Sequence, residues 1–126
     1  MPPLGGILES SLYVDDLKRS VRFYETIFGF ELISAGERLC AMKAAPQQLL
    51  LLFKKRASVD HDGDGQLHVA FAIPAAALAE WETWLAQHGI KIEQRKTWER
   101  GGQSLYFRDP DQHLLEVATP GVWSNY

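Results

Sequence analysis

The sequence predicts an α+β fold built from two βαβββ modules. Two observations carry this prediction: a strand, a helix and three strands are expected in the first half of the chain, and the same order returns in the second half. The halves also align with each other, because the helix-ending glycines Gly29 and Gly89 are 60 positions apart and Pro46 and Pro110 are 64 apart. A repeat of half the chain indicates paired modules rather than a solenoid.

The first module is expected over residues 5–55. It begins with a β-rich run over residues 7–14 and continues with a helix over residues 16–29, which Asp15 or Asp16 can cap. The apolar side chains of this helix recur at helical spacing and form one stripe: Leu17, Val21, Tyr24 and Phe28. Three strands are expected after the helix, over residues 30–36, 38–44 and 49–55.

The second module is expected over residues 66–120, after a polar linker over residues 56–65. It should contain a strand over 67–73, a helix over 75–89 with an inward face made of Leu78, Trp81 and Leu85, and strands over 91–98, 103–108 and 113–119. The Asp-rich segment of the linker is not an EF-hand loop. Counted from Asp60, the twelfth position is Phe71, where such a loop needs glutamate.

Composition limits the classes of function. The chain of 126 residues is expected to form one domain, residues 1–126, and its net charge of -3 with scattered basic residues argues against nucleic acid as a partner. A single cysteine, Cys40, excludes an internal disulfide and favours a reducing compartment. No apolar run approaches the roughly 20 residues of a membrane span, so we expect a cytoplasmic protein with no membrane partner.

Polar side chains share faces of the predicted strands. Alternation puts Glu116 on the opposite face from its apolar neighbours Leu115 and Val117, where an unpaired charge would cost several kcal/mol. His113 falls on the other face and is not expected to join Glu116. The polar or small-residue faces of the predicted strands carry these candidates: Glu9, Ser11, His68, Ser104, Tyr106 and Glu116.

Glu9, His68 and Glu116 together have the character of a metal-ligand set. Imidazole and carboxylate suit Zn, Fe, Mn, Ni or Co, and a metal ion would also compensate a buried charge. The alternative is that these residues have purely structural roles. A single buried histidine is more often a satisfied core residue, and a single buried glutamate can pair with an arginine.

At these residues the chain resembles the vicinal oxygen chelate superfamily. The resemblance rests on SSLYVDDLKRSVRFYETIFGFEL, HVAFAI and SLYFRDPDQHLLEVATP, and it covers nearly the whole chain. The superfamily includes glyoxalase I, fosfomycin-resistance enzymes, extradiol dioxygenases and metal-free bleomycin-resistance proteins. Its fold implies paired βαβββ modules whose cupped mixed sheets form a metal-centred cavity.

The resemblance also implies roles for particular residues. The family's metal ligands fall on Glu9, His68 and Glu116, while the fourth ligand of glyoxalase I falls on Leu51, which cannot bind a metal ion. Glu9 is either a ligand or a general base, and Glu116 and Tyr106 are the other catalytic candidates. The candidates for binding substrate are Ser11, Trp98, Arg100, Ser104 and Tyr106, and Trp98 to Gly102 are expected to form a mobile lid.

These roles imply a metal-dependent lyase, isomerase or transferase that acts on a small oxygen-chelating substrate through Lewis-acid catalysis. Two alternatives stay open: a metal-free small-molecule binding protein of the bleomycin-resistance type, and an Fe(II) extradiol-type dioxygenase. A chain with only two modules is expected to form a homodimer that shares the site between its subunits. Uncovered strand edges favour a partner as well.

Overall fold

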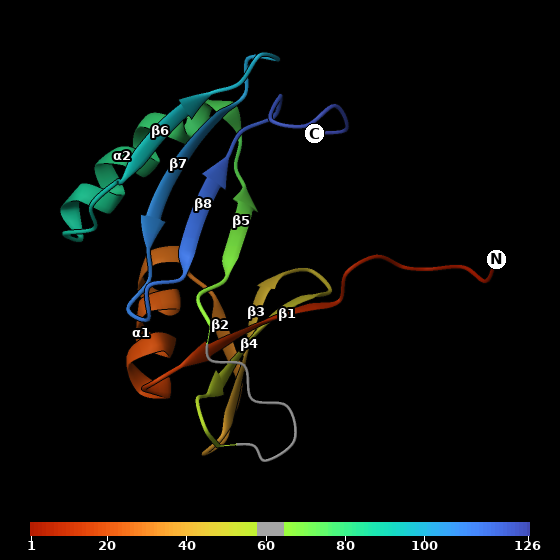
Figure 1. The fold of residues 1–126 in the computed structure, drawn as a ribbon, viewed down its shortest axis with the longest axis vertical. Coiled ribbons are helices and arrows are strands. Elements are labelled where there is room, and N and C mark those ends of the chain that lie inside the picture. The colour runs from red at the N-terminus through yellow and green to blue at the C-terminus, as the bar shows by residue number, and fades with distance from the viewer. Residues whose placement is uncertain (58–64) are drawn as a thin grey trace. The chain divides into compact units, whose positions relative to one another are not determined.

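The computed structural model describes residues 1–57 and 65–126, which fold into two compact units, Met1–Gln66 and Leu67–Tyr126 (Figure 1). Each unit contains a four-stranded mixed sheet. The Asp-rich segment and most of the predicted linker fall on residues 58–64 and lie outside the described residues. Where the chain is described, no helix combines the length and the apolar character that crossing a membrane requires.

The first unit has the predicted order of a strand, a helix and three strands. Its sheet has the order β1-β4-β3-β2, in which β1 is parallel to β4 and the other neighbours are antiparallel. The elements are β1 (Glu9–Val14), α1 (Leu17–Phe28), β2 (Glu31–Ala35), β3 (Leu39–Ala45) and β4 (Gln48–Lys54).

The second unit repeats this topology. Its sheet has the order β5-β8-β7-β6, and β5 is parallel to β8, as β1 is to β4. The elements are β5 (His68–Ala72), the 3-10 turn η1 (Ala75–Ala77), α2 (Leu78–Gln87), β6 (Gln94–Thr97), β7 (Gln103–Arg108) and β8 (Leu114–Ala118). The predicted α+β fold of two βαβββ modules is therefore confirmed.

Helix α1 begins and ends where the sequence indicates. The Asp16 carboxylate accepts a hydrogen bond of 3.1 Å from the Arg19 backbone N–H, and this bond is the main reason that the pKa of Asp16 is lowered. Gly29 ends the helix in the left-handed conformation, with φ 67°. The buried face differs slightly from the predicted stripe. Ile27 is buried, whereas Phe28 is only partly buried and stacks on Phe30 with ring centroids 5.2 Å apart.

The second helix starts later than the sequence predicts. Residues Ala75–Ala77 form a 3-10 turn, and the α-helix begins at Leu78. Alanine has no side-chain oxygen to satisfy the first backbone N–H groups of a helix, and a tighter first turn is a common alternative. Of the predicted inward face, Leu85 is fully buried, while Leu78 and Trp81 are partly exposed.

The central strands β4 and β8 carry the core of each sheet. Leu50, Leu51 and Leu52 of β4 are all buried, so both faces of this strand are covered. Strand β8 is buried over Leu115–Ala118, and this stretch includes the charged residue Glu116. The two strands have the same position in their sheets, but only β8 places a carboxylate there.

Candidate functional site

Glu116 lies at the middle of the second sheet. Its neighbours in register are Ala70 on β5 and Tyr106 on β7, so the three side chains form one row across three strands. Only 5% of the Glu116 surface is exposed. Ala70 is small, which leaves room on the β5 side of the carboxylate for the side chain of the next residue on the same face, His68.

The structure brings His68 and Glu116 into contact. His68 Nε2 lies 3.1 Å from Glu116 Oε2, and His68 Nδ1 lies 3.0 Å from the Leu114 carbonyl oxygen. A carbonyl oxygen can only accept, so Nδ1 carries a proton and donates to it. In neutral His68 the lone pair of Nε2 therefore faces the carboxylate.

Two hydrogen-bond acceptors that face each other repel unless one of them is protonated or a cation binds between them. Either His68 takes a second proton and forms an ion pair with Glu116, or a cation binds to both groups. Metal-bound histidines usually donate their second ring N–H to a carbonyl or carboxylate, as Nδ1 does here. Two ligands on adjacent positions of one metal ion lie about 3 Å apart, given bonds of about 2.1 Å. The pair therefore fits a metal ion.

The second oxygen of the buried Glu116 carboxylate is the next feature of the site. Among the described residues, Glu116 Oε1 has no hydrogen-bond partner although it is buried. Burying a carboxylate oxygen without a hydrogen-bond partner costs free energy. In native proteins such an atom often interacts with a bound ion. This orphaned oxygen is a second observation that fits a cation at Glu116.

The predicted third ligand belongs to the first unit. Glu9 opens β1, is exposed and shares its face with Ser11, which is partly buried. Across the described residues, no three His, Cys, Asp or Glu side chains gather closely enough to hold a metal ion. The ligand role of Glu9 and the substrate role of Ser11 remain predictions.

Tyr106 borders the pair on the β7 side. Its ring centroid lies 6.1 Å from that of His68. Burial raises the pKa of Tyr106, and the negative charge of the nearby Glu116 carboxylate raises it further. The phenol is consequently protonated at neutral pH and has a hydrogen to donate.

The structure links Ser104 to Trp98. The indole Nε1–H of Trp98 donates to Ser104 Oγ over 2.9 Å, and Ser104 is almost fully buried. Arg100, by contrast, is exposed in the turn between β6 and β7. Sequence reasoning identified these three residues as separate substrate contacts and did not anticipate the bond between two of them.

Lys96 is a residue that sequence reasoning missed. It lies opposite Ser104 in the β6–β7 register, and its ammonium group stands 3.5 Å from the centroid of the Trp98 ring. Alternation along the predicted strand would have found it, because Lys96 and Trp98 are two residues apart. Lys96 adds a positive charge to the face that carries Ser104 and Tyr106.

The segment predicted as a mobile lid, Trp98 to Gly102, is a hydrogen-bonded turn in the structure. The Trp98 N–H donates to the Gly102 carbonyl over 2.8 Å, and the Gly101 N–H donates to the Trp98 carbonyl over 2.9 Å. A Cβ atom added at Gly102 would clash with the backbone of Gly121 and Val122, so the turn packs directly on the C-terminal tail. Glycine is needed at position 102 for this close approach rather than for freedom of movement.

The tail is itself fastened to the sheet, which the sequence did not reveal. The Tyr126 hydroxyl lies 3.2 Å from the Ile73 carbonyl and 3.0 Å from the Ala118 carbonyl, where β5 and β8 end. His113 is fully buried beside the turn before β8, and its Nδ1 accepts a hydrogen bond from the Leu67 N–H. Its predicted place outside the site remains a prediction.

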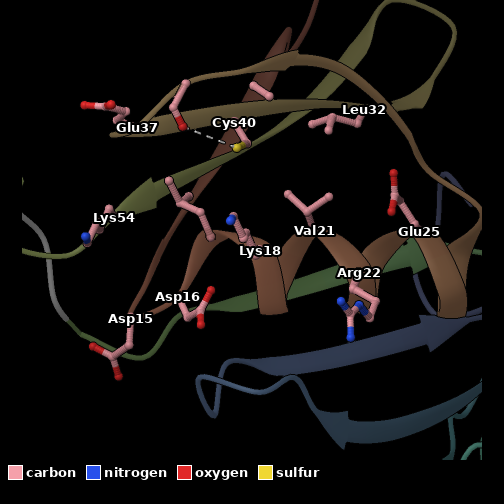
Figure 2. Close-up of a pocket in the computed structure, with 13 residues that line it drawn as sticks. Asp15, Asp16, Lys18, Val21, Arg22, Glu25, Leu32, Glu37, Cys40 and Lys54 are labelled. Carbon is pink, nitrogen blue, oxygen red and sulfur yellow. Dashed lines mark hydrogen bonds between the residues drawn. The ribbon is translucent and has the colours of Figure 1, made fainter.

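The first unit contains a cavity of about 720 Å³ beside the N-terminal half of α1 (Figure 2). Leu17, Val21 and Cys40 contribute apolar surface, and charged side chains such as Lys18 and Glu37 surround it. The Cys40 thiol is buried, as predicted for a core residue, and its sulfur lies 3.9 Å from the Gly36 carbonyl oxygen. None of the candidate site residues lines this cavity.

Comparison with known proteins gives one family. Residues 6–117 match the profile of the Glyoxalase/Bleomycin resistance protein/Dioxygenase superfamily. The chain is 30% identical to metallothiol transferase FosB of Shouchella clausii over 92% of this chain and 81% of that protein. It is also 30% identical to metallothiol transferase FosB of Bacillus licheniformis, over 94% of this chain and 77% of the relative.

Solved structures give the same picture. The crystal structure of a lactoylglutathione lyase from Agrobacterium tumefaciens superimposes with a TM-score of 0.88 and 32% identity, covering 98% of this chain and 99% of the lyase. The fosfomycin resistance protein FosX of Mesorhizobium loti shares the fold, with a TM-score of 0.71 and 23% identity over 95% of this chain and 96% of its own.

Proposed function

Since the chain belongs to the Glyoxalase/Bleomycin resistance protein/Dioxygenase superfamily, we propose that it is a divalent-metal-dependent transferase that joins a small thiol to a small oxygen-rich substrate. The broader prediction, an enzyme of the glyoxalase superfamily, is confirmed by relatives that are named as a transferase and a lyase. Fosfomycin is the first substrate to test, because the relatives include fosfomycin resistance proteins.

One observation carries this proposal. Within the described part of the chain, one oxygen of the buried Glu116 carboxylate has no hydrogen-bond partner. The other oxygen lies 3.1 Å from Nε2 of His68, whose Nδ1 already donates to a carbonyl. His68 and Glu116 would hold the metal ion, which supplies Lewis-acid activation of a substrate oxygen when bound. The His68 side chain is half exposed, so a substrate could reach this residue from solvent.

We propose Glu9 as the third ligand. A ligand from the other module would complete a set of two carboxylates and one imidazole, which suits Zn, Mn, Co, Ni or Fe and leaves positions for substrate. That module belongs either to the same chain or to a second copy. Strands β1 and β5 are the edges of their sheets, and a homodimer would cover such edges.

The remaining candidates would bind and orient the substrate. Tyr106 keeps its proton because its pKa is raised, and it can donate that hydrogen to a substrate oxygen near the metal. Ser104 and Lys96 share the face of Tyr106, and Lys96 would attract an anionic substrate. Arg100 and Ser11 keep their proposed roles as outer contacts, and Glu9 would act as general base if it does not ligate.

A lyase is the second candidate. It is favoured by the structural match to a lactoylglutathione lyase at 32% identity. Against it stands Leu51, which occupies the position that resembles the fourth metal ligand of glyoxalase I and is buried between Ser11 and Ala41. A site with three protein ligands therefore favours the transferase over the lyase.

Turnover tests the proposal directly. The protein is purified without chelator, loaded in turn with Mn²⁺, Ni²⁺, Co²⁺, Zn²⁺ or Fe²⁺, and incubated with fosfomycin and cysteine or glutathione. We expect thiol to disappear and a thiol–substrate adduct to appear by mass spectrometry only with metal. E116Q should abolish the adduct, and E93Q, which alters a surface ion pair with Arg108, should not.

The outcomes separate the alternatives. Metal-independent binding of a small molecule without turnover would favour the bleomycin-resistance type, in which His68 and Glu116 are an ion pair. Oxygen consumption with catechols in the presence of Fe(II) would favour the dioxygenase. Isomerisation of the hemithioacetal of methylglyoxal and glutathione would favour the lyase.

A further inference from the structure

The chain after β8 forms a tail that is fastened to the second sheet at two places. Near its start, the Thr119 N–H donates to the Gln103 carbonyl over 3.0 Å, and the Gln103 N–H donates to the Thr119 hydroxyl oxygen over 2.8 Å. Further along, the Tyr126 hydroxyl bonds to the Ile73 and Ala118 carbonyls. A phenol has one hydrogen to donate, so the two carbonyls share it where β5 and β8 end.

Between these two attachments the tail packs on the turn that joins β6 to β7. A Cβ atom added at Gly121 would clash with the Gly102 nitrogen and the Arg100 carbonyl oxygen. Gly121 also has a positive φ of 97°, a conformation that favours glycine. The Gly121 N–H donates to the Tyr126 backbone oxygen over 2.6 Å, so the residue that fastens the tail also holds the residue that touches the turn.

The turn needs this support because of the strand that precedes it. Strand β6 lies at the edge of its sheet, and its four residues are all exposed. An edge strand has backbone bonds on one side only, and an exposed element opens easily. Trp98 follows β6, and its N–H and carbonyl are bonded to Gly102 and Gly101 inside the turn. The position of Trp98 therefore depends on the turn, and the turn rests on the tail.

Trp98 connects the turn to the face of the sheet that carries the candidate site. Its indole N–H donates to Ser104 Oγ over 2.9 Å, and the Lys96 ammonium group stands 3.5 Å from the centroid of its ring. Lysine has a long flexible side chain, and Lys96 is exposed. The contact with the Trp98 ring limits where its charge can lie.

We propose that Tyr126 is a positioning residue: by fastening the tail it holds the turn that carries Trp98, and it thereby places the Lys96 charge where an anionic substrate would meet it. The part of this inference that concerns substrate rests on the proposed function. The part that concerns the tail, Trp98 and Lys96 does not, and the two parts are tested separately.

Two variants loosen the tail in different ways. Y126F removes the hydroxyl and keeps the ring, and G121A adds a Cβ atom that clashes with the turn. The first control is W123F, which alters a tail side chain that is 68% exposed. The second control is G6A, since Gly6 also has a positive φ, 107°, but has open space around it. If G121A does not fold, Y126F decides the test alone, because it removes a single hydroxyl.

Nuclear magnetic resonance tests the tail without substrate. With ¹⁵N-labelled tryptophan, and W98F to assign the signal, we expect the order parameter of the Trp98 indole N–H to fall from about 0.85 toward about 0.6 in Y126F and G121A. The Trp84 indole on α2 should stay unchanged, which separates local loosening from a general change in the unit. Protons above an aromatic ring resonate upfield, so the Lys96 side-chain protons next to the ammonium group, assigned with K96M, should move downfield in both variants.

The outcomes of this experiment decide the first part of the inference. Both controls should leave the Trp98 and Lys96 signals as they are in the unaltered protein. Unchanged Trp98 and Lys96 signals in Y126F would overturn the proposal. An equal loss of order at Trp98 and Trp84 would overturn it as well, because the hydroxyl would then stabilise the unit as a whole and not the turn.

Turnover tests the substrate part. In an active metal-loaded protein with fosfomycin and a thiol, Y126F should raise KM for fosfomycin about 2- to 5-fold, the value of an exposed cation–π contact, and leave kcat unchanged. K96M should raise KM at least as much, and the double variant should match K96M, because both changes act through one charge. Increases in KM that multiply in the double variant, or an unchanged KM in Y126F, would contradict this part. If the unaltered protein does not turn over, the proposed function fails while the Trp98 and Lys96 signals still decide the role of Tyr126.

Discussion

Strands β4 and β8 occupy the same position in two sheets of the same topology, but only β8 carries a buried charged side chain at its centre. Leu51 in β4 lies between Ser11 and Ala41, and its whole environment is that of a buried aliphatic side chain. Glu116 in β8 lies between Ala70 and Tyr106 and contacts His68. The same backbone therefore provides a protected central position in both sheets, and only the second sheet fills it with a carboxylate that contacts a histidine.

The largest effect should come from making β8 resemble β4. E116L removes the proposed ligand, and we expect metal-dependent turnover to fall more than about 100-fold, since even outer-shell partners of a metal ligand cost 10- to 100-fold. The metal-free protein should keep its stability or gain up to about 2 kcal/mol in free energy of unfolding, because an aliphatic side chain replaces a buried charge. Initial rates and urea denaturation measure the two effects. A stable E116L protein with unchanged turnover would show that the reaction does not need Glu116.

The converse change makes β4 resemble β8. L51E buries a carboxylate beside serine and alanine, without the histidine and tyrosine that accompany Glu116, so we expect the free energy of unfolding to fall by about 2–4 kcal/mol. Chemical denaturation at pH 7 measures this loss. The control is I33E on β2, where the side chain is half exposed and should change stability little. Equal effects at the two positions would show that the environment of Leu51 tolerates charge.

The row across β7 and β8 predicts a smaller change in the titration of Tyr106. Burial is the first cause of its raised pKa and Glu116 is the next, so E116Q should lower the pKa of Tyr106 toward that of free tyrosine without restoring it fully. A raised pKa means that the folded state holds the phenol proton more tightly, so this contribution to stability is lost as pH rises through the pKa of the folded protein. NMR of ¹³Cζ-labelled tyrosine between about pH 8 and pH 12 measures the shift. An increase in E116Q would contradict the assigned cause.

The smallest predicted effect compares the two helix ends. Gly29 and Gly89 have φ angles of 67° and 68°, and a Cβ at either would meet no atom within 4 Å. The cost of G29A and of G89A is therefore conformational alone, about 1 kcal/mol in each module. Thermal denaturation of both variants measures it. A much larger loss at one position would show that the two modules do not end their helices in the same way.

Much of this fold could be predicted from the sequence, because its elements have local causes. Asp16 caps α1, Gly29 and Gly89 end the helical segments, and alternation identified the face that His68 shares with Glu116. The start of α2 was less visible, since the choice between a 3-10 and an α turn over three alanines depends on small differences in backbone energy.

The site was only partly predictable, for reasons that are not local. The bond from Trp98 to Ser104 and the stacking of Lys96 follow from the register of β6 on β7, which the sequence does not fix. The turn at Gly102 looked flexible in the sequence, but Gly121 and Val122 of the tail, nineteen and twenty residues later, fill the space beside it. The extent of the domain, the third ligand and the homodimer remain predictions.

Measuring bound metal shows whether His68 and Glu116 hold a metal ion. The unaltered protein, E116L and E93Q are expressed and purified in parallel without chelator, dialysed against one divalent metal at a time, and analysed by mass spectrometry for bound metal. We expect tight, roughly stoichiometric binding in the unaltered protein and in E93Q. Binding should weaken as the pH falls, since His68 must be deprotonated at Nε2 to ligate, and it should be lost in E116L. Equal metal content in all three proteins, or none in any, would contradict the claim that His68 and Glu116 hold a metal ion.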